Sequence, residues 1–249
     1  MIHTMKRISF LLVLLISLNC FAQKPTIYGI GDSTMANKVN PNENPERGWG
    51  QMVPLFLSDK IQFDNRAVNG RSTRSFINEK LWDAVYNKLK PGDYVFIQFG
   101  HNDAKEKDSL RYTNPHTAYR HNLIRFVTET REKGATPIIF SSIIRRNFNE
   151  VGVLIPTHGD YTLEARLVAQ ELNVPFIDME YYTELLEQSY GPEKSKKLHL
   201  HYKAGEIPYY KEDKADDTHL CVKGATEVAK IAINELMKTK LELVNYIKN

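Results

Sequence analysis

The chain has 249 residues, of which 42% are hydrophobic and 25% are charged, and its formal net charge at pH 7 is +3. That length suits one α/β domain with a sizeable core. The near balance of charges excludes the strong overall field with which basic proteins attract nucleic acid or a membrane surface.

The first residues have the pattern of an export signal. Lys6 and Arg7 supply a positive start, and residues 10–18 form an apolar run that is too short to span a bilayer. Small residues then precede a cleavage point between Ala22 and Gln23. We therefore predict a signal peptide over residues 1–22 and export to the periplasm or the medium. A buried N-terminal helix and a lipoprotein acylated at Cys20 are the weaker alternatives. No other stretch is long and apolar enough to predict a membrane span.

Cleavage would leave residues 23–249, which we predict to form a single domain. The signal holds two basic residues and no acidic one, so its removal lowers the formal charge from +3 to +1. Cys221 is then the only cysteine left, and no disulfide within the chain is expected. We interpret Cys221 as a small buried side chain rather than a reactive thiol.

Short apolar runs alternate with longer segments of helical spacing along this domain. In chain order, the pattern predicts strand 26–30, helix 48–57, strand 61–68, helix 76–89, strand 94–99, helix 115–132, strand 137–144, helix 161–172, strand 175–178 and helix 223–247. Residues 194–217, which include two histidines and several lysines, match no pattern that we can assign.

The alternation of strands and helices predicts the fold class. Runs that are apolar on both faces suit strands covered by helices on both sides. We therefore expect an α/β protein, a three-layer α/β/α sandwich with a central parallel sheet of about five strands. No internal repeat or second domain is indicated.

Polar, glycine-marked corners follow three of the predicted strands. Ser33 follows the first strand, Asn69 and Gly70 follow the second, and residues 100–103 follow the third. In a parallel sheet the carboxyl ends of the strands share one edge, where reactive groups gather. We therefore expect these corners to lie close together.

A serine, a histidine and a carboxylate stand at the two ends of the domain. Ser33 lies near its start, and Asp216 precedes His219 by three residues near its end. A serine hydroxyl becomes a good nucleophile when a neighbouring base takes its proton, and the base needs a partner that fixes its tautomer. The spacing favours Asp216 as that partner, although the adjacent Asp217 remains an alternative. These residues predict a serine esterase site.

Ester cleavage also needs hydrogen-bond donors where negative charge builds up on the carbonyl oxygen. The backbone N–H groups of Ser33 and Gly70 and the side-chain amide of Asn102 are our candidates for this oxyanion hole. A glycine at position 70 allows close approach of the backbone to a substrate.

These motifs together resemble the SGNH (GDSL-type) hydrolase superfamily. The blocks that carry the resemblance are Gly31-Asp32-Ser33, Gly70, Gly100-x-Asn102-Asp103 and Asp216-x-x-His219. The chain is most similar to the rhamnogalacturonan acetylesterase group of carbohydrate esterases, through Gly31 to Met35, Phe99 to Asp103, Thr157 to Tyr161 and Asp216 to Leu220. The resemblance implies a flavodoxin-like fold and the removal of acetyl groups from a pectic polysaccharide through an acyl-enzyme. It also implies Ser33 as the nucleophile, His219 as the base and Asp216 as its partner.

Two side chains are candidates for contact with the substrate. Arg71, next to Gly70, is our preferred contact for a negative charge, and His158 belongs to a motif shared with the acetylesterase group. His158, His199 and His201 do not predict a metal site, because no cysteine or carboxylate completes a ligand set. We expect no metal and no cofactor.

The expected partner is an acetylated polysaccharide or oligosaccharide. The alternatives are an acetylesterase for another sugar such as xylan, a lipolytic enzyme or thioesterase on the same scaffold, and an inactive carbohydrate-binding relative. The sequence leaves the exact sugar, the acetyl position and the oligomeric state open.

Overall fold

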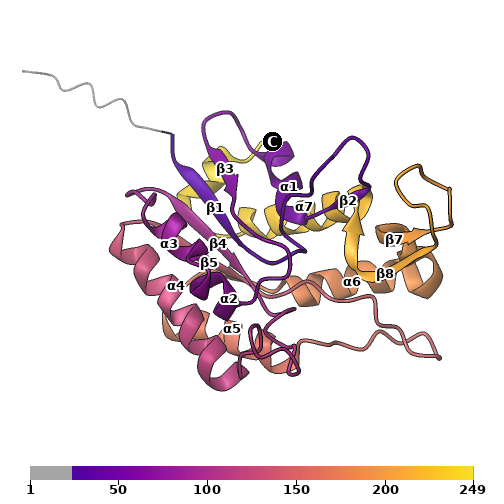
Figure 1. Cartoon of the computed structure of the whole chain (residues 1–249). Coiled ribbons are helices and arrows are strands. Elements are labelled where there is room, and N and C mark those ends of the chain that lie inside the picture. The colour runs from indigo at the N-terminus through magenta and orange to yellow at the C-terminus, as the bar shows by residue number, and fades with distance from the viewer. Residues whose placement is uncertain (1–23, 249) are drawn as a thin grey trace, which may run out of the picture.

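A computed structural model describes residues 24–248, and a five-stranded parallel sheet runs through its centre (Figure 1). The strands are β1 (Thr26–Gly31), β3 (Gln62–Asn65), β4 (Tyr94–Gln98), β5 (Thr136–Phe140) and β6 (Phe176–Ile177). Their order across the sheet is β3-β1-β4-β5-β6. Every neighbouring pair is parallel, which confirms the predicted fold class.

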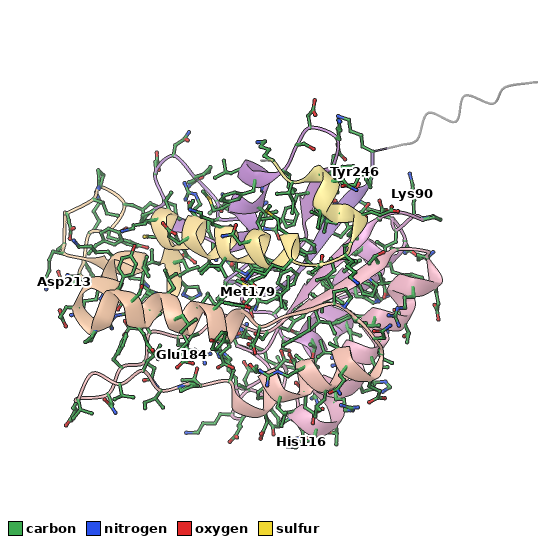
Figure 2. All side chains as sticks on the ribbon, turned by 180° about the vertical axis from the view of Figure 1, so that it is seen from behind. Lys90, His116, Met179, Glu184, Asp213 and Tyr246 are labelled. Atoms are coloured by element: carbon green, nitrogen blue, oxygen red, sulfur yellow. The ribbon has the colours of Figure 1, made fainter. Side chains whose placement is uncertain are left out.

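Helices cover both faces of this sheet. They are α1 (Trp49–Met52), α2 (Thr73–Asn78), α3 (Leu81–Tyr86), α4 (Arg120–Glu132), α5 (Gly159–Glu171), α6 (Met179–Lys194) and α7 (Val222–Met237). Side chains of α1 and α7 pack in one core cluster, and those of α2 to α5 pack in the other. Seen from behind, α6 and α7 lie side by side across one face (Figure 2).

The pleat of the strands divides the core between these two clusters. In β4, Tyr94 and Phe96 belong to the cluster with α1 and α7, whereas Val95 and Ile97 belong to the opposite one. Successive side chains of a strand point to opposite faces, so a strand that is covered twice must be apolar throughout. This is why the nearly continuous apolar run at 94–99 predicted a strand covered on both faces.

Several predicted elements have different bounds in the structure. The helix expected over 48–57 is α1 followed by a 3₁₀ helix at Val53–Phe56, and the strands expected over 61–68 and 137–144 end at Asn65 and Phe140. The helix expected over 76–89 is two helices, α2 and α3, because Lys80 adopts a left-handed conformation with φ of 59° between them. The last helix ends at Met237 rather than at residue 247. The Thr239 hydroxyl donates to the carbonyl of Leu236 there, and a 3₁₀ helix follows at Glu242–Tyr246.

The sequence analysis missed helix α6 and a second sheet. Two of the four buried positions of α6 are the glutamates Glu180 and Glu187, so its apolar periodicity is weak. The second sheet is antiparallel, with strands β2 (Glu46–Arg47), β8 (Lys214–Cys221) and β7 (His199–Tyr202) in that order. It lies on the right of Figure 1 and contains residues 199–202 and 214–217 of the segment that matched no pattern.

No helix between residues 24 and 248 combines the length and the apolar character that crossing a bilayer requires. The predicted signal peptide lies outside the described residues. Cys221 is buried, as expected, and its thiol donates to the carbonyl of Lys197.

Candidate active site

The structure joins Ser33, His219 and Asp216 in one chain of hydrogen-bonding contacts. The Nε2 atom of His219 lies 2.9 Å from the Oγ atom of Ser33, although the two residues are 186 positions apart in the sequence. The Nδ1 atom of the same ring lies 2.9 Å from Oδ2 of Asp216. The imidazole therefore contacts a hydroxyl on one side and a carboxylate on the other, as the sequence predicted.

A tight turn after β1 presents Ser33. The N–H groups of Met35 and Ala36 both donate to the carbonyl of Asp32, which bends the chain directly after the strand. The buried Asp32 carboxylate fixes this turn, because its Oδ1 accepts from both the N–H and the hydroxyl of Thr34. Ser33 itself stays half-buried and borders a cavity.

Asp216 and His219 meet across an irregularity in β8. Residues 199 and 200 on β7 pair with residues 220 and 216 on β8, so residues 217–219 have no partners in this ladder. The Oδ1 atom of Asp216 closes the resulting loop by accepting from the N–H groups of Thr218 and His219, at 3.0 and 2.9 Å. One carboxylate thus shapes the loop with one oxygen and contacts the imidazole with the other.

Asp217, the alternative partner, faces away from His219. Its Oδ1 atom contacts Arg146 Nη1 at 2.8 Å and His201 Nε2 at 2.7 Å. The structure therefore places Asp216, and not Asp217, against the imidazole.

The surroundings of Asp216 stabilise its ionised form. Burial pushes the pKa of this carboxyl upward, but hydrogen bonds from His219 and Thr218 and the charge of His219 outweigh burial and hold the pKa well below its usual range. An ionised Asp216 requires a proton on Nδ1 of His219 and leaves Nε2 free to accept the proton of Ser33.

The three predicted oxyanion-hole groups line the same cavity. Within residues 24–248, the N–H groups of Ser33 and Gly70 donate no hydrogen bond. Gly70 has φ of +76°, a left-handed conformation that favours glycine. The Asn102 amide donates to the carbonyl of Arg71 at 3.1 Å, which fixes its orientation and leaves its second N–H available.

Lys38, which the sequence analysis missed, connects two loops of this site. Its buried ammonium donates to the carbonyl of Ser33 at 2.6 Å and to the side chain of Asn69 at 2.7 Å, and pairs with Glu46 at 2.7 Å. The loop after β1 is thereby held against the loop after β3. The only signal in the sequence was a lysine in a loop rich in Asn and Pro, where a lysine is normally solvated.

A buried His199–Glu187 pair supports His219 from behind. The Nε2 atom of His199 lies 2.7 Å from Glu187 Oε1, and its Nδ1 atom faces the carbonyl of His219 at 3.2 Å. A carbonyl accepts only, so Nδ1 of His199 carries a proton and donates. Helix α6 is thereby connected to the backbone of the site histidine.

The cavity beside Ser33 has a volume of about 620 Å³ and a polar lining. Its walls are formed by Ser33, Glu46, Asn69, Gly70, His101, Asn102, Lys105, Arg145, Asp216, Thr218 and His219. Another cavity, of about 630 Å³, lies at the amino ends of β1 and β4 and contains none of the predicted site residues.

Arg71 and His158, the two predicted substrate contacts, do not line this cavity. Arg71 forms a salt bridge with Glu79 at 2.7 Å, so its positive charge is already paired. His158 is buried, and its Nε2 atom lies 2.5 Å from Nδ1 of His101. Of these two histidines, only His101 borders the cavity, and the two rings meet edge to face.

Burial disfavours the charged form of both histidines in this pair. Burial lowers the pKa of His101 well below its usual value, and the proximity of His158 and Arg145 lowers it further. Burial also lowers the pKa of His158, although Glu180 partly opposes the shift. Two neutral rings can share one N–H between them, so the pair supplies a rigid wall rather than a charge. Between residues 24 and 248, no cluster of three or more metal-ligating side chains is present.

Comparison with known proteins gives a consistent family match. The model of the GDSL-like lipase/acylhydrolase family matches residues 30–225. The chain is 38% identical over 221 residues to the rhamnogalacturonan acetylesterase RhgT of Bacillus subtilis, covering 89% of this chain and 93% of that relative. It is 31% identical over 185 residues to the rhamnogalacturonan acetylesterase of Emericella nidulans, covering 67% and 71% of the two chains.

Solved structures show the same fold. The protein YxiM of Bacillus subtilis superposes with a TM-score of 0.76 at 26% identity, over 88% of this chain and 58% of that protein's length. The acetylxylan esterase Axe2 of Geobacillus stearothermophilus superposes with a TM-score of 0.62 at 19% identity, over 88% and 95% of the chains. The resemblance that the sequence motifs indicated is confirmed.

Proposed function

Because the chain belongs to the GDSL-like lipase/acylhydrolase family and is therefore an ester hydrolase, we propose that it removes acetyl groups from a rhamnogalacturonan-like pectic polysaccharide. The observation that carries the proposal is the contact chain from Asp216 through His219 to Ser33 beside unpaired backbone N–H groups. The acetylesterase relatives, which match most of the chain, support the substrate class.

In the proposed mechanism, Ser33 Oγ attacks the acetyl carbonyl carbon while His219 Nε2 takes its proton. The tetrahedral oxyanion accepts hydrogen bonds from the N–H groups of Ser33 and Gly70 and from the Asn102 amide. When the bond to the sugar oxygen breaks, His219 gives its proton to that oxygen. Water, deprotonated by the same Nε2, then attacks the acetyl-enzyme, and acetate leaves as Ser33 regains its proton. Asp216 stabilises the imidazolium in both halves of the reaction.

The polar cavity favours a small acyl group on a sugar. All of its lining side chains except Gly70 carry polar groups, so a long alkyl chain would gain little apolar contact there. An acetyl group needs no such contact, and the hydroxyls of a sugar can bond to the polar walls. We also propose that residues 1–22 direct export of the protein to the periplasm or the medium, where a polymeric substrate is accessible.

The proposal is tested by measuring acetate release from a substrate panel. The panel consists of acetylated rhamnogalacturonan, acetylated xylan and a p-nitrophenyl ester with a long acyl chain. We expect the highest kcat/KM on the pectic substrate. A higher kcat/KM on acetylated xylan would show that the protein acts on another polysaccharide. A preference for the long-chain ester would identify a lipolytic enzyme.

Replacing Asn102 with alanine tests the oxyanion hole. Loss of one such donor typically lowers kcat by about 10²–10³-fold, and we expect that loss for Asn102→Ala with a much smaller change in KM. Steady-state kinetics on p-nitrophenyl acetate would give both constants. Asn122 provides a control, because its amide bonds to Thr73 away from the cavity, so Asn122→Ala should keep kcat. Equal kcat values in the two variants would remove Asn102 from the mechanism.

A further inference from the structure

The charges that line the cavity divide into paired and unpaired groups. The two carboxylates are paired, Glu46 with Lys38 at 2.7 Å and Asp216 with both His219 and Lys214, at 2.9 and 3.2 Å. Arg145 and Lys105 form no salt bridge with any carboxylate of residues 24–248. The uncompensated charge of the cavity is therefore positive.

Arg145 is held rigidly in this position. Its Nη1 atom donates to the Thr157 hydroxyl at 3.0 Å and its Nη2 atom donates to the carbonyl of His101 at 3.2 Å. Both acceptors are neutral oxygens, and the half-buried guanidinium has further N–H donors to offer. The carboxylates of Asp32 and Glu180 lie near enough to influence the pKa of Arg145, but neither forms a salt bridge with it. Asp32 accepts a hydrogen bond from Thr34, and Glu180 faces His158.

Partial burial of a guanidinium without a counter-ion is unfavourable in the free protein. The cost is recovered if an anion enters the cavity, because arginine binds a planar carboxylate through two parallel hydrogen bonds. Lys105 is exposed at the rim of the same cavity and adds a second positive charge without a fixed geometry.

We propose that Arg145 and Lys105 form a subsite for a uronic acid carboxylate of the bound polysaccharide. This inference rests on the proposed function and specifies how an anionic polysaccharide is distinguished from a neutral one. Arg145 supplies the directional contact, and Lys105 attracts the charge and assists at the rim. Arg71, the residue that the sequence favoured for this role, is already neutralised by Glu79.

The test compares an anionic and a neutral substrate in the same variants. For Arg145→Gln, we expect kcat/KM on an acetylated rhamnogalacturonan oligosaccharide to fall about tenfold to a hundredfold, the effect of losing hydrogen bonds to a charged group. On p-nitrophenyl acetate, which carries no carboxylate, the same variant should change kcat/KM by less than about threefold. Arg145→Lys keeps the charge and should recover part of the loss on the anionic substrate.

Lys105→Gln gives a second test that does not depend on folding, because this side chain is exposed. We expect a fall of about threefold to tenfold on the anionic substrate alone, and that fall should shrink as salt is added. Lys107→Gln is the matched control, since Lys107 is exposed on the same loop but does not line the cavity, and it should match the wild type on both substrates.

Three results would overturn the subsite. Equal losses on both substrates would make Arg145 a structural residue, and a selective loss in Arg71→Gln but not in Arg145→Gln would move the subsite to Arg71. Weaker inhibition by acetate in Arg145→Gln, with unchanged KM for the oligosaccharide, would mean that the guanidinium binds the product. Failure of the proposed function is distinct, because the wild type itself would then release no acetate from the pectic substrate.

Discussion

Replacing Ser33 with alanine is expected to lower kcat for acetate release by on the order of 10⁴- to 10⁶-fold, because no other group in the cavity replaces the attacking oxygen. The fold should survive the change. Among residues 24–248, the Ser33 hydroxyl bonds only to His219, and its side chain lies at the cavity rather than in either core cluster. The measurement is acetate release together with thermal unfolding.

A covalent serine probe makes this experiment sharper. The wild type should gain the mass of one probe molecule on the peptide that contains Ser33, and Ser33→Ala should gain none. Ser109→Ala is a suitable control, because Ser109 is exposed and does not line the cavity. A folded Ser33→Ala protein with more than about 1% of wild-type kcat would rule out the proposed mechanism.

Replacing Asp216 with asparagine should cost about 10⁴-fold in kcat, because an amide in this place favours the wrong tautomer of His219. The neighbouring Asp217→Asn is a closely matched control. It removes the same charge one residue away, but from a carboxylate that contacts Arg146 and His201. We expect it to keep kcat within about threefold of the wild type, as for a partly exposed ion pair outside the reaction. Comparable losses in both variants would mean that the local loop, rather than one carboxylate, matters.

The same pair of variants predicts a pH dependence of stability. The pKa of Asp216 is lower in the folded than in the unfolded protein, so ionised Asp216 stabilises the fold above the unfolded pKa, near 4. This contribution disappears as the pH falls through the lower folded pKa. The gap in Tm between the wild type and Asp216→Asn should therefore be largest near neutral pH and shrink in strong acid. It should be modest, because the carboxylate is partly exposed to water.

The larger strands could be predicted because their burial is visible in the chain itself. The run at 94–99 is apolar except for Gln98, and the structure covers both of its faces. Helix α6 could not be predicted in this way. Its buried Glu180 and Glu187 face His158 and His199, which belong to other elements, so the buried face of α6 has polar residues where a pattern would need apolar ones.

Contacts with the substrate were the least predictable part of the site. Arg71 and Arg145 are both arginines that follow a strand of the parallel sheet, and nothing local separates them. Their roles differ because Glu79 pairs with Arg71, whereas the guanidinium of Arg145 donates to two neutral oxygens. Lys38 is a similar case, because its ammonium pairs with Glu46 at the end of the same loop and donates to Asn69 in the loop after β3.

The amino-acid sequence alone determined the alternating order of strands and helices and the corners that bring Ser33, Gly70 and Asn102 to one edge of a sheet. These follow from periodicity and from the geometry of parallel strands, which are local or topological properties. Only the tertiary structure decided that Asp216 rather than Asp217 contacts His219, and that Arg145 rather than Arg71 is left without a counter-ion. Pairing depends on distances of a few ångströms between distant segments, and the order of residues in a chain does not contain those distances.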